Sequence, residues 1–230
     1  MNAEARPRRV SLLLAACVAI AAAVLTVAVS ENHSAQAHRD HHHAAAADDM
    51  NARELALHDD MRALWEAHIV WTRLAIISFA EGMPDFEATA GRLLQNQVDI
   101  GNAIQPYYGA QAGKQLTKLL QEHITGAVDL LTAAKANDRA AFDAASEAWY
   151  RNGDEIARFL ADANPRNWKF GVVAAMMKGH LDQTLAEAAH RLEGNFEADI
   201  HDYEAIHRHI LQMADALSSG IIAQFPQRFR

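Results

Sequence analysis

From about residue 51 onward, hydrophobic residues recur at the spacing of amphipathic helices, with apolar positions three and four residues apart. Gly, Pro and Asn interrupt this pattern and divide it into six helical segments joined by short connections, which favour antiparallel neighbours. The pattern therefore predicts an all-α fold, a six-helix bundle over residues 51–230. The interruptions fall at Gly82-Met83-Pro84, Pro106 to Gly109, Ala136-Asn137-Asp138, Asn164-Pro165, Gly194-Asn195 and Pro226.

Residues suited to helix starts follow several of these interruptions. Asp85, Asp138 and Asn195 can cap the N-termini of the second, fourth and sixth helices, because short polar side chains accept hydrogen bonds from free backbone N–H groups. Pro165 is expected at the first position of the fifth helix, where its missing N–H costs nothing.

Three pairs of helices carry related motifs in the same order. The odd helices carry His68, His123 and His180, spaced by 55 and then 57 residues. A polar motif follows on each even helix, and each motif is followed by a proline. This order predicts one αα-hairpin present in three diverged copies, over about 51–109, 110–165 and 166–226. The polar motifs are Asn96-Gln97-Val98-Asp99, Asn152-Gly153-Asp154-Glu155 and Met213-Ala214-Asp215, and the prolines are Pro106, Pro165 and Pro226.

The N-terminal 37 residues have the pattern of an export signal. Arg6, Arg8 and Arg9 precede an uncharged apolar run over residues 10–29, and Ala35-Gln36-Ala37 offers a cleavage site between small residues. The run is long enough to span a bilayer, so an uncleaved membrane anchor is the alternative. A lipoprotein cleavage box at residues 14–17 is the least favoured interpretation, because little of the run precedes Cys17. Every alternative predicts an extracytoplasmic protein, secreted or anchored to the cytoplasmic membrane.

Composition limits the partners of the domain. The formal net charge is −8, and it becomes −9 without residues 1–37, which hold three Arg and two Glu. Such an acidic surface argues against nucleic acid as a partner and against broad binding to anionic lipid. The single cysteine, Cys17, lies in the export segment, so the bundle must be stabilised by packing or by a bound ligand.

Residues 38–50 form a low-complexity tether rich in His and Ala, with too little apolar surface to fold. Clustered imidazoles bind transition metals, so a metal-capture role is one interpretation. A polar spacer that binds metal only incidentally is the favoured one. The histidines concerned are His38, His41, His42 and His43.

His68 and His123 lie within apolar stripes that should face the core, whereas the surroundings of His180 are only partly apolar. Burying polar side chains requires partners, and two explanations compete. In the first, the three histidines converge on a metal ion (Zn, Fe, Mn or Cu) together with Glu155, Asp99 or Asp215. In the second, each histidine bonds to the Asn or carboxylate of its own hairpin and sets helix register.

Other charged residues receive simpler interpretations. Arg73 is expected to neutralise Asp99 or Glu155. Two Glu-x-x-His pairs have the spacing used by di-iron bundles, but their helical phase is poor, so both are expected mostly at the surface. The stretch from Arg191 to Asp199 is expected to be an exposed helix end. The two pairs are Glu187 with His190 and Glu204 with His207.

Several motifs stand out between about Leu57 and Pro226, among them Leu64-Trp65, Glu122-His123 and Trp149-Tyr150. Through these motifs the chain resembles a family of uncharacterised bacterial all-helical proteins that often carry an export segment. Some members bear the labels glycosyltransferase or acetylglutamate kinase, but this chain has no Gly-rich phosphate loop and no strand-helix alternation to support either. The resemblance implies a fold and a location, and no activity. It rests on Leu64-Trp65, His68, Trp71-Thr72-Arg73, Glu122-His123, Trp149-Tyr150, Asn152, Asp154-Glu155-Ile156 and Met213-Ala214-Asp215.

These patterns favour an exported helical-bundle protein that binds a metal ion or small ligand through core His and carboxylate residues, or an envelope module with a structural or sensory role. The alternative is a metal-dependent enzyme that uses the same residues for hydrolytic or redox chemistry. We favour the non-enzymatic hypothesis, because no serine or thiol nucleophile motif occurs in the domain. A membrane would be a partner only through an uncleaved N-terminal segment.

Overall fold

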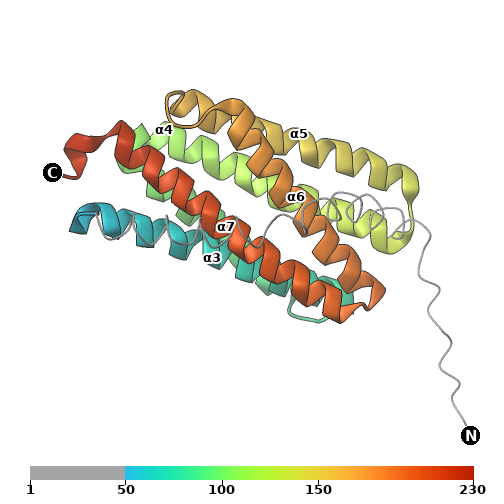
Figure 1. The fold of residues 1–230 in the computed structure, drawn as a ribbon. Helices are drawn as coiled ribbons and strands as arrows, with labels where there is room; N and C mark the ends of the chain where they lie inside the picture. The colour runs from blue at the N-terminus through green and yellow to red at the C-terminus, as the bar shows by residue number, and fades with distance from the viewer. Residues whose placement is uncertain (1–49) are drawn as a thin grey trace, which may run out of the picture.

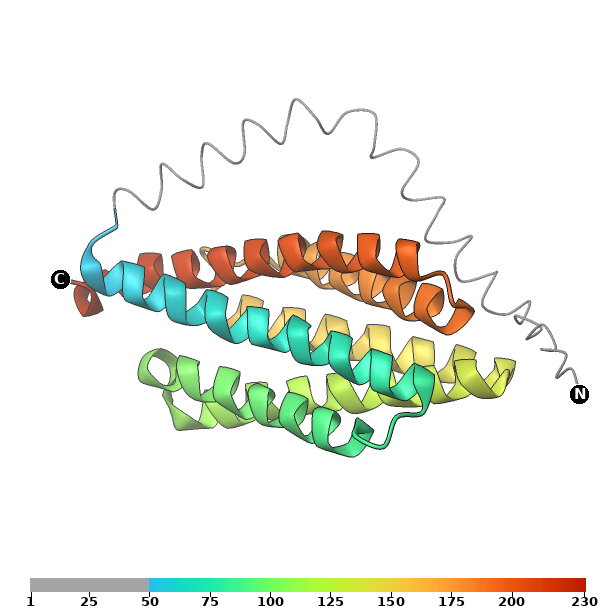
Figure 2. The same ribbon diagram turned by 90° about the horizontal axis from the view of Figure 1, so that it is seen from below.

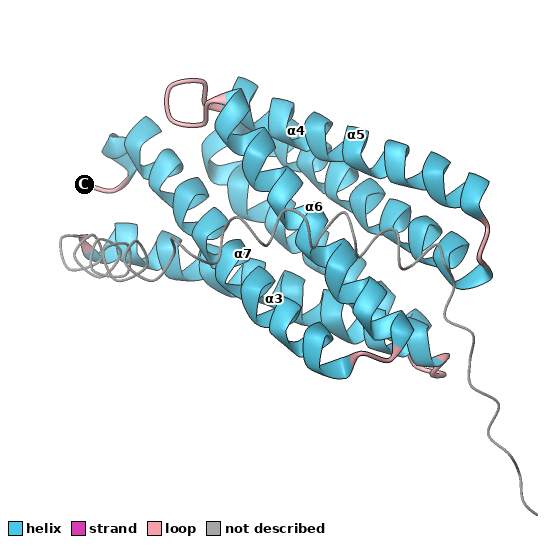
Figure 3. Cartoon of the chain, turned by 45° about the vertical axis from the view of Figure 1, so that its right-hand side comes forward, coloured by secondary structure: helices cyan, strands magenta, loops and turns pink. Residues whose placement is uncertain are grey.

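The structure of this chain is a computed structural model that describes residues 50–230. This part consists of helices and loops and contains no strand (Figure 3), which confirms the predicted all-α class. The predicted export segment and all but the last residue of the predicted tether lie outside the described residues. The helices are α3 (Ala52–Glu81), α4 (Phe86–Ala136), α5 (Arg139–Ala163), α6 (Phe170–Glu193) and α7 (Phe196–Gln224), followed by the 3₁₀ turn η1 (Pro226–Arg228).

The helix ends follow local backbone chemistry in most places. Asn51 caps α3 in a capping box with Glu54, and the predicted caps Asp138 and Asn195 accept hydrogen bonds from N–H groups of α5 and α7. Asp85 precedes α4 but makes no side-chain cap. The expectation for Pro165 was wrong, because α6 begins only at Phe170.

Backbone and side-chain contacts hold the segment after Pro165 outside the helix. The backbone N–H groups of Asn167 and Trp168 bond to the carbonyl oxygen of Asn164, which closes a turn. The Trp168 indole then donates to the carbonyl of Ala216 at 3.1 Å, and so attaches this turn to α7. The tertiary contact with α7 therefore delays the start of α6.

Gly109 reverses the direction of the chain in the middle of α4. Its φ of 86° and ψ of 164° are not helical, and only glycine adopts them without strain. The arms on either side fold back on each other, with the Thr117 hydroxyl bonded to the carbonyl of Gln97 and the Gln121 amide to that of Leu94. Because one residue makes the reversal without a loop, α4 is assigned as one element, and the described part has five helices instead of the six predicted.

Each helix packs against its neighbours in the chain, and α7 also packs against α3, so the helices form a closed ring. The bundle is elongated, and the start of α3 lies at the same end as the C-terminus (Figures 1 and 2). Among residues 50–230, no helix has the length and apolar character needed to cross a membrane.

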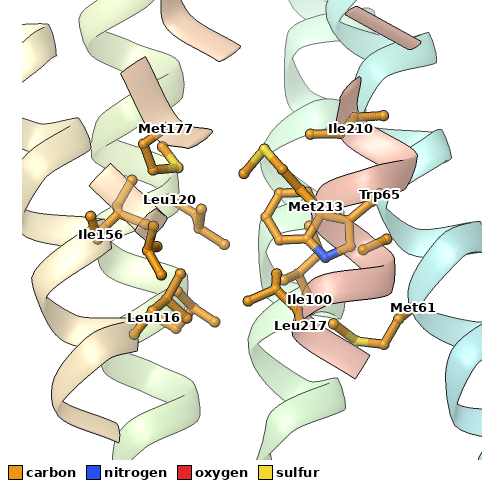
Figure 4. Packing of buried hydrophobic residues seen from close by; sticks show 14 of the residues in the cluster. Met61, Trp65, Ile100, Leu116, Leu120, Ile156, Met177, Ile210, Met213 and Leu217 are labelled. Carbon is orange, nitrogen blue, oxygen red and sulfur yellow. The ribbon is translucent and has the colours of Figure 1, made fainter. Parts of the chain in front are cut away.

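One large apolar core runs through the bundle and receives side chains from every helix. Figure 4 shows Met61 and Trp65 of α3, Ile100 of α4 and Met213 of α7 close together, with Ile156 of α5 across the bundle. Each fully buried aliphatic or aromatic side chain contributes about 1.5–3 kcal/mol relative to an exposed one. Packing therefore stabilises the described domain, in which no cysteine occurs.

We expect Gly220→Ala to destabilise the domain by about 1–3 kcal/mol, since overpacking a core has costs of this size. A methyl group at Gly220 would lie 2.0 Å from the indole nitrogen of Trp168 and would push the ring off the Ala216 carbonyl. Gly171→Ala is the matched control, because Gly171 is helical and has no atom near its would-be methyl group. Urea denaturation of both variants measures the difference, and equal midpoints would contradict the expectation.

Candidate functional site

The three predicted core histidines meet in the interior of the bundle. His68 comes from α3, His123 from the second arm of α4, and His180 from α6, and their exposed fractions are 2%, 4% and 3%. The ring centroids of His68 and His180 lie 5.6 Å apart, and those of His123 and His180 lie 5.9 Å apart. The apolar stripes noted in the sequence therefore turn all three rings toward one region, here called the imidazole cluster.

Tryptophan side chains enclose two rings of the imidazole cluster. The Trp65 ring meets His68 edge-on at a centroid distance of 5.7 Å, and Trp149 stacks on His123 at 5.1 Å. The Trp149 indole also donates to the backbone carbonyl of His123 at 3.0 Å. These contacts keep the histidines away from bulk water.

Two of the histidines have side-chain partners through Nδ1. For His123, Nδ1 lies 3.1 Å from Oδ1 of Asn152, an acceptor, so the ring carries its proton on Nδ1 and presents a lone pair at Nε2. For His68, Nδ1 lies 3.2 Å from Nε2 of Gln97, so this nitrogen accepts. The sequence also suggested that each histidine bonds to the Asn or carboxylate of its own hairpin. His123 does so, because it pairs with Asn152.

Burial keeps all three rings neutral at neutral pH. Desolvation lowers the pKa of His68 to about 3, with a further contribution from His123, and lowers the pKa of His123 to about 4. The pKa of His180 falls well below its ordinary value, mainly because of burial and then because of the neighbouring imidazoles of His68, His123 and His209. Neutral imidazole is the form that binds metal ions.

Several polar atoms at the imidazole cluster are buried without a hydrogen-bond partner from residues 50–230. They are Nδ1 of His180, Oε1 of Gln97 and Nε1 of Trp65. Because a buried donor or acceptor without a partner costs about 1–3 kcal/mol, such atoms need an explanation.

The backbone around the imidazole cluster is bonded in a similar way on three helices. Each cluster histidine has a carbonyl group four residues before it that accepts from a side chain of another helix or helix arm. The donors are Asn96 to Leu64, Asn152 to Leu119 and His209 to Met176, at 3.0, 3.1 and 2.9 Å. Asn96 and Asn152 stand at equivalent positions of the polar motifs, which is the sequence signal for this role, whereas the role of His209 has no such signal.

The predicted carboxylate ligands lie elsewhere. Glu155 is exposed, and Asp99 bonds to the Gln95 amide at 3.1 Å. Asp215 is held by Arg62 at 2.7 Å and by Nε2 of His58 at 3.0 Å. The structure therefore brings together the three histidines and leaves these carboxylates with solvent or with other partners. As the side chains stand, no group of three or more His, Cys, Asp or Glu in residues 50–230 is arranged to hold a metal ion.

A second buried polar cluster lies further along α6 and corrects two expectations. It consists of Arg73, Glu187, Asp199 and Arg191 and is here called the ion-paired cluster. Glu187, expected mostly at the surface, has an exposed fraction of 0%, and Asp199, expected in an exposed helix end, has one of 1%. Both carboxylates accept from Nη1 of Arg73 at 2.8 Å. Arg73 therefore does not neutralise Asp99 or Glu155 as predicted, because α7 packs beside α3 and carries Asp199 to the guanidinium.

The electrostatics of Glu187 reflect its burial. Desolvation raises the pKa of Glu187 to about 7, although Arg73 acts in the opposite direction. Arg191 reaches Asp199 at 3.4 Å and Glu81 at 3.3 Å. The other Glu-x-x-His pair lies near the surface as expected, with Glu204 exposed and His207 bonded to Glu66 at 3.0 Å.

Two cavities in the described part of the chain lie away from the imidazole cluster. A cavity of about 440 Å³ lies between the start of α3, the bend of α4 and the C-terminal turn, and is lined by Arg53, Tyr107 and Phe229 among others. A second of about 370 Å³ lies between α5 and α6 and is lined by Tyr150 and Met177 among others. No histidine of the imidazole cluster lines either cavity.

Comparison of the chain with family models, with curated proteins and with solved structures found no match. The resemblance to a family of exported helical proteins therefore stays a prediction, and the site must be interpreted from its own geometry.

We expect Arg73→Met to destabilise the domain by about 3–5 kcal/mol, because it leaves two buried carboxylates without their shared cation. Arg151→Met is the matched control. Its pair with Glu147 is exposed and should contribute less than about 1 kcal/mol. Thermal and urea unfolding measure both effects, and similar small losses in the two variants would contradict the expectation.

The stability of the parent chain should fall as the pH is lowered from 6.5 toward 4. The unfolded chain binds a proton at His123 near pH 6.5, whereas the folded chain does so only near its lowered pKa of about 4. His123→Gln should therefore reduce the slope of unfolding free energy against pH by about 1 kcal/mol per unit between pH 6 and 5.

The measurement is urea denaturation at several pH values with a metal chelator present. His201→Gln, at an exposed position, serves as control and should keep the parent slope. Identical slopes for His123→Gln and the parent would show that His123 is not buried in the neutral form.

Proposed function

We propose that this chain is an exported helical-bundle protein that binds a divalent transition-metal ion at the imidazole cluster. The observation that carries the proposal is the meeting of three neutral imidazoles from three helices in the buried interior. Neutral imidazole suits Zn, Cu, Fe and Ni. The residues proposed to hold the ion are His68, His123 and His180.

The spacing of the rings supports this proposal. With a Zn–N bond of about 2.0–2.1 Å, the centroids of two imidazoles on one tetrahedral ion lie about 5 Å apart. The observed centroid separations of 5.6 and 5.9 Å are only slightly larger. Binding of one ion by all three histidines therefore requires ring rotations and shifts that also bring His68 and His123, each of which contacts His180, to the same point.

The hydrogen-bond partners of the histidine rings also support the proposed metal site. Ligating histidines usually donate their other N–H to a carbonyl or carboxylate, which orients the ring. His123 already does so through Asn152. His68 would contribute Nδ1, which accepts from the Gln97 amide as the side chains stand and would turn from it to the ion. The Gln97 amide itself is held by its donation to the backbone carbonyl of Leu93 at 2.9 Å. The unpartnered Nδ1 of His180 provides the third nitrogen.

The predicted threefold hairpin is part of the same proposal. In each proposed hairpin, a side chain of the second helix bonds the carbonyl four residues before the cluster histidine of the first. The reversal at Gly109 supports counting the arms of α4 as the second and third helices of six. Duplication of one hairpin accounts for three histidines at equivalent positions, as the sequence pattern suggests.

The proposal is tested in the full chain after His38, His41, His42 and His43 are changed to Ser, so that the imidazoles of the tether cannot bind the metal. We expect isothermal titration with Zn²⁺ or Cu²⁺ to give about one equivalent per chain, because the three histidines form one site. His180→Gln and His68→Gln should each weaken binding by about tenfold or more, since loss of ligand or orienting groups has effects of this size.

His201→Gln is the control, because this histidine is exposed on α7 and should not change affinity. Circular dichroism confirms that each variant is folded. Equal affinities in His180→Gln and His201→Gln would exclude the imidazole cluster as the site. Binding that disappears with the tether histidines would instead assign the metal to the tether.

A further inference from the structure

One face of α6 carries a row of buried polar atoms that have no hydrogen-bond partner among residues 50–230. The row consists of Nδ1 of His180, Oε1 of Gln183, Oε2 of Glu187 and Nε of Arg191. At 100° per residue these positions fall within an arc of about 80° on the helix. The row starts at the imidazole cluster and ends where α6 approaches its C-terminus.

The spacing of these residues along α6 is compatible with bridging water. With a rise of 1.5 Å per residue, the backbone positions of neighbouring members of the row are about 4.5–6 Å apart along the helix axis. One water that makes two hydrogen bonds of about 2.8 Å spans a similar distance. Buried polar atoms without protein partners are usually satisfied by such ordered water.

We infer that this face of α6 lines a water-filled polar seam, which connects the imidazole cluster to the surface at Arg191 and admits metal ions to it. The seam itself follows from the row of polar atoms, whereas its role in ion entry rests on the proposed function. The side chain of Arg191 retains an exposed fraction of 16% and pairs with the partly exposed Glu81. The outer end of the seam therefore reaches the solvent.

The charges along the seam suit a hydrated cation. Glu81, Glu187 and Asp199 contact Arg73 or Arg191, and Asp202 lies near enough to raise the pKa of Glu187. Four acidic side chains thus stand against the guanidinium groups of Arg73 and Arg191 and the His190 ring, which lies 2.6 Å from Asp202. Because burial raises the pKa of Glu187 to about 7, this group carries only part of a negative charge at neutral pH. The unpartnered oxygens of Gln183 and Glu187 are acceptors that can bond the water shell of a cation.

Gln183→Leu tests the seam without removing a proposed ligand or a member of the ion-paired cluster. The background is the full chain with the four tether histidines changed to Ser, and the probe is Co²⁺, whose visible absorbance reports coordination. We expect association in stopped-flow to slow by about tenfold or more, because the leucine displaces bridging water. Affinity at equilibrium should change little. Gln212→Leu, on an exposed position of α7, is the control and should keep the parent rate.

A crystal structure of the full parent chain gives an independent readout. We expect water oxygens within about 3.2 Å of Oε1 of Gln183 and Oε2 of Glu187. Absence of these waters would overturn the seam even if metal binds. Waters together with equal association rates in Gln183→Leu and Gln212→Leu would overturn the entry route. Failure of the parent to bind Co²⁺ would overturn the proposed function and the entry route, and the waters would then decide whether the seam exists.

Discussion

An imidazole ring inside a dry helical core must give its nitrogens partners, or the fold loses free energy for each one left alone. This constraint governs the middle of the bundle. Asn152 supplies a partner for His123 and also bonds the carbonyl of Leu119, so that one amide holds two groups of the facing arm. Gln97 and Asn96 divide the same two tasks between them for His68 and Leu64. His180 differs, because its Nδ1 has no hydrogen-bond partner among residues 50–230, and the proposed binding site depends on that difference.

The ion-paired cluster at the other end of α6 obeys the same constraint with charged groups. Arg73 forms ion pairs with the buried carboxylates of Glu187 and Asp199, and Arg191 forms a second ion pair with Asp199. Removing Arg73 would leave the buried Glu187 carboxylate without a cation and Asp199 with Arg191 only, which costs far more than the loss of a surface pair. This cluster joins α3, α6 and α7, so the helices that carry His68 and His180 are also held in register at a second point.

Helix α6 therefore connects both polar regions of the interior. Its positions 180 and 187 lie two turns apart on one face, the first in the imidazole cluster and the second in the ion-paired cluster. Between them stands Gln183 with an unpartnered oxygen. A helix whose buried face is polar over this length packs less tightly than an apolar one unless water or a ligand fills the gaps. The proposed metal site and the proposed polar seam both rest on that arrangement.

The sequence alone determined the all-α class, most helix ends, and the burial of His68 and His123, because apolar periodicity and caps are local properties of the chain. The burial of His180, whose helical neighbours are only partly apolar, was decided by packing. The sequence also predicted a helix end between Pro106 and Gly109, where the chain reverses its direction. Only the tertiary structure decided which polar groups meet. Asp99, Glu155 and Asp215 occupy suitable positions in the repeat pattern, yet they face the solvent or other partners. Arg73 instead finds Glu187 and Asp199, more than a hundred residues away, since helical phase gives the face of a side chain and only packing gives the neighbour across it.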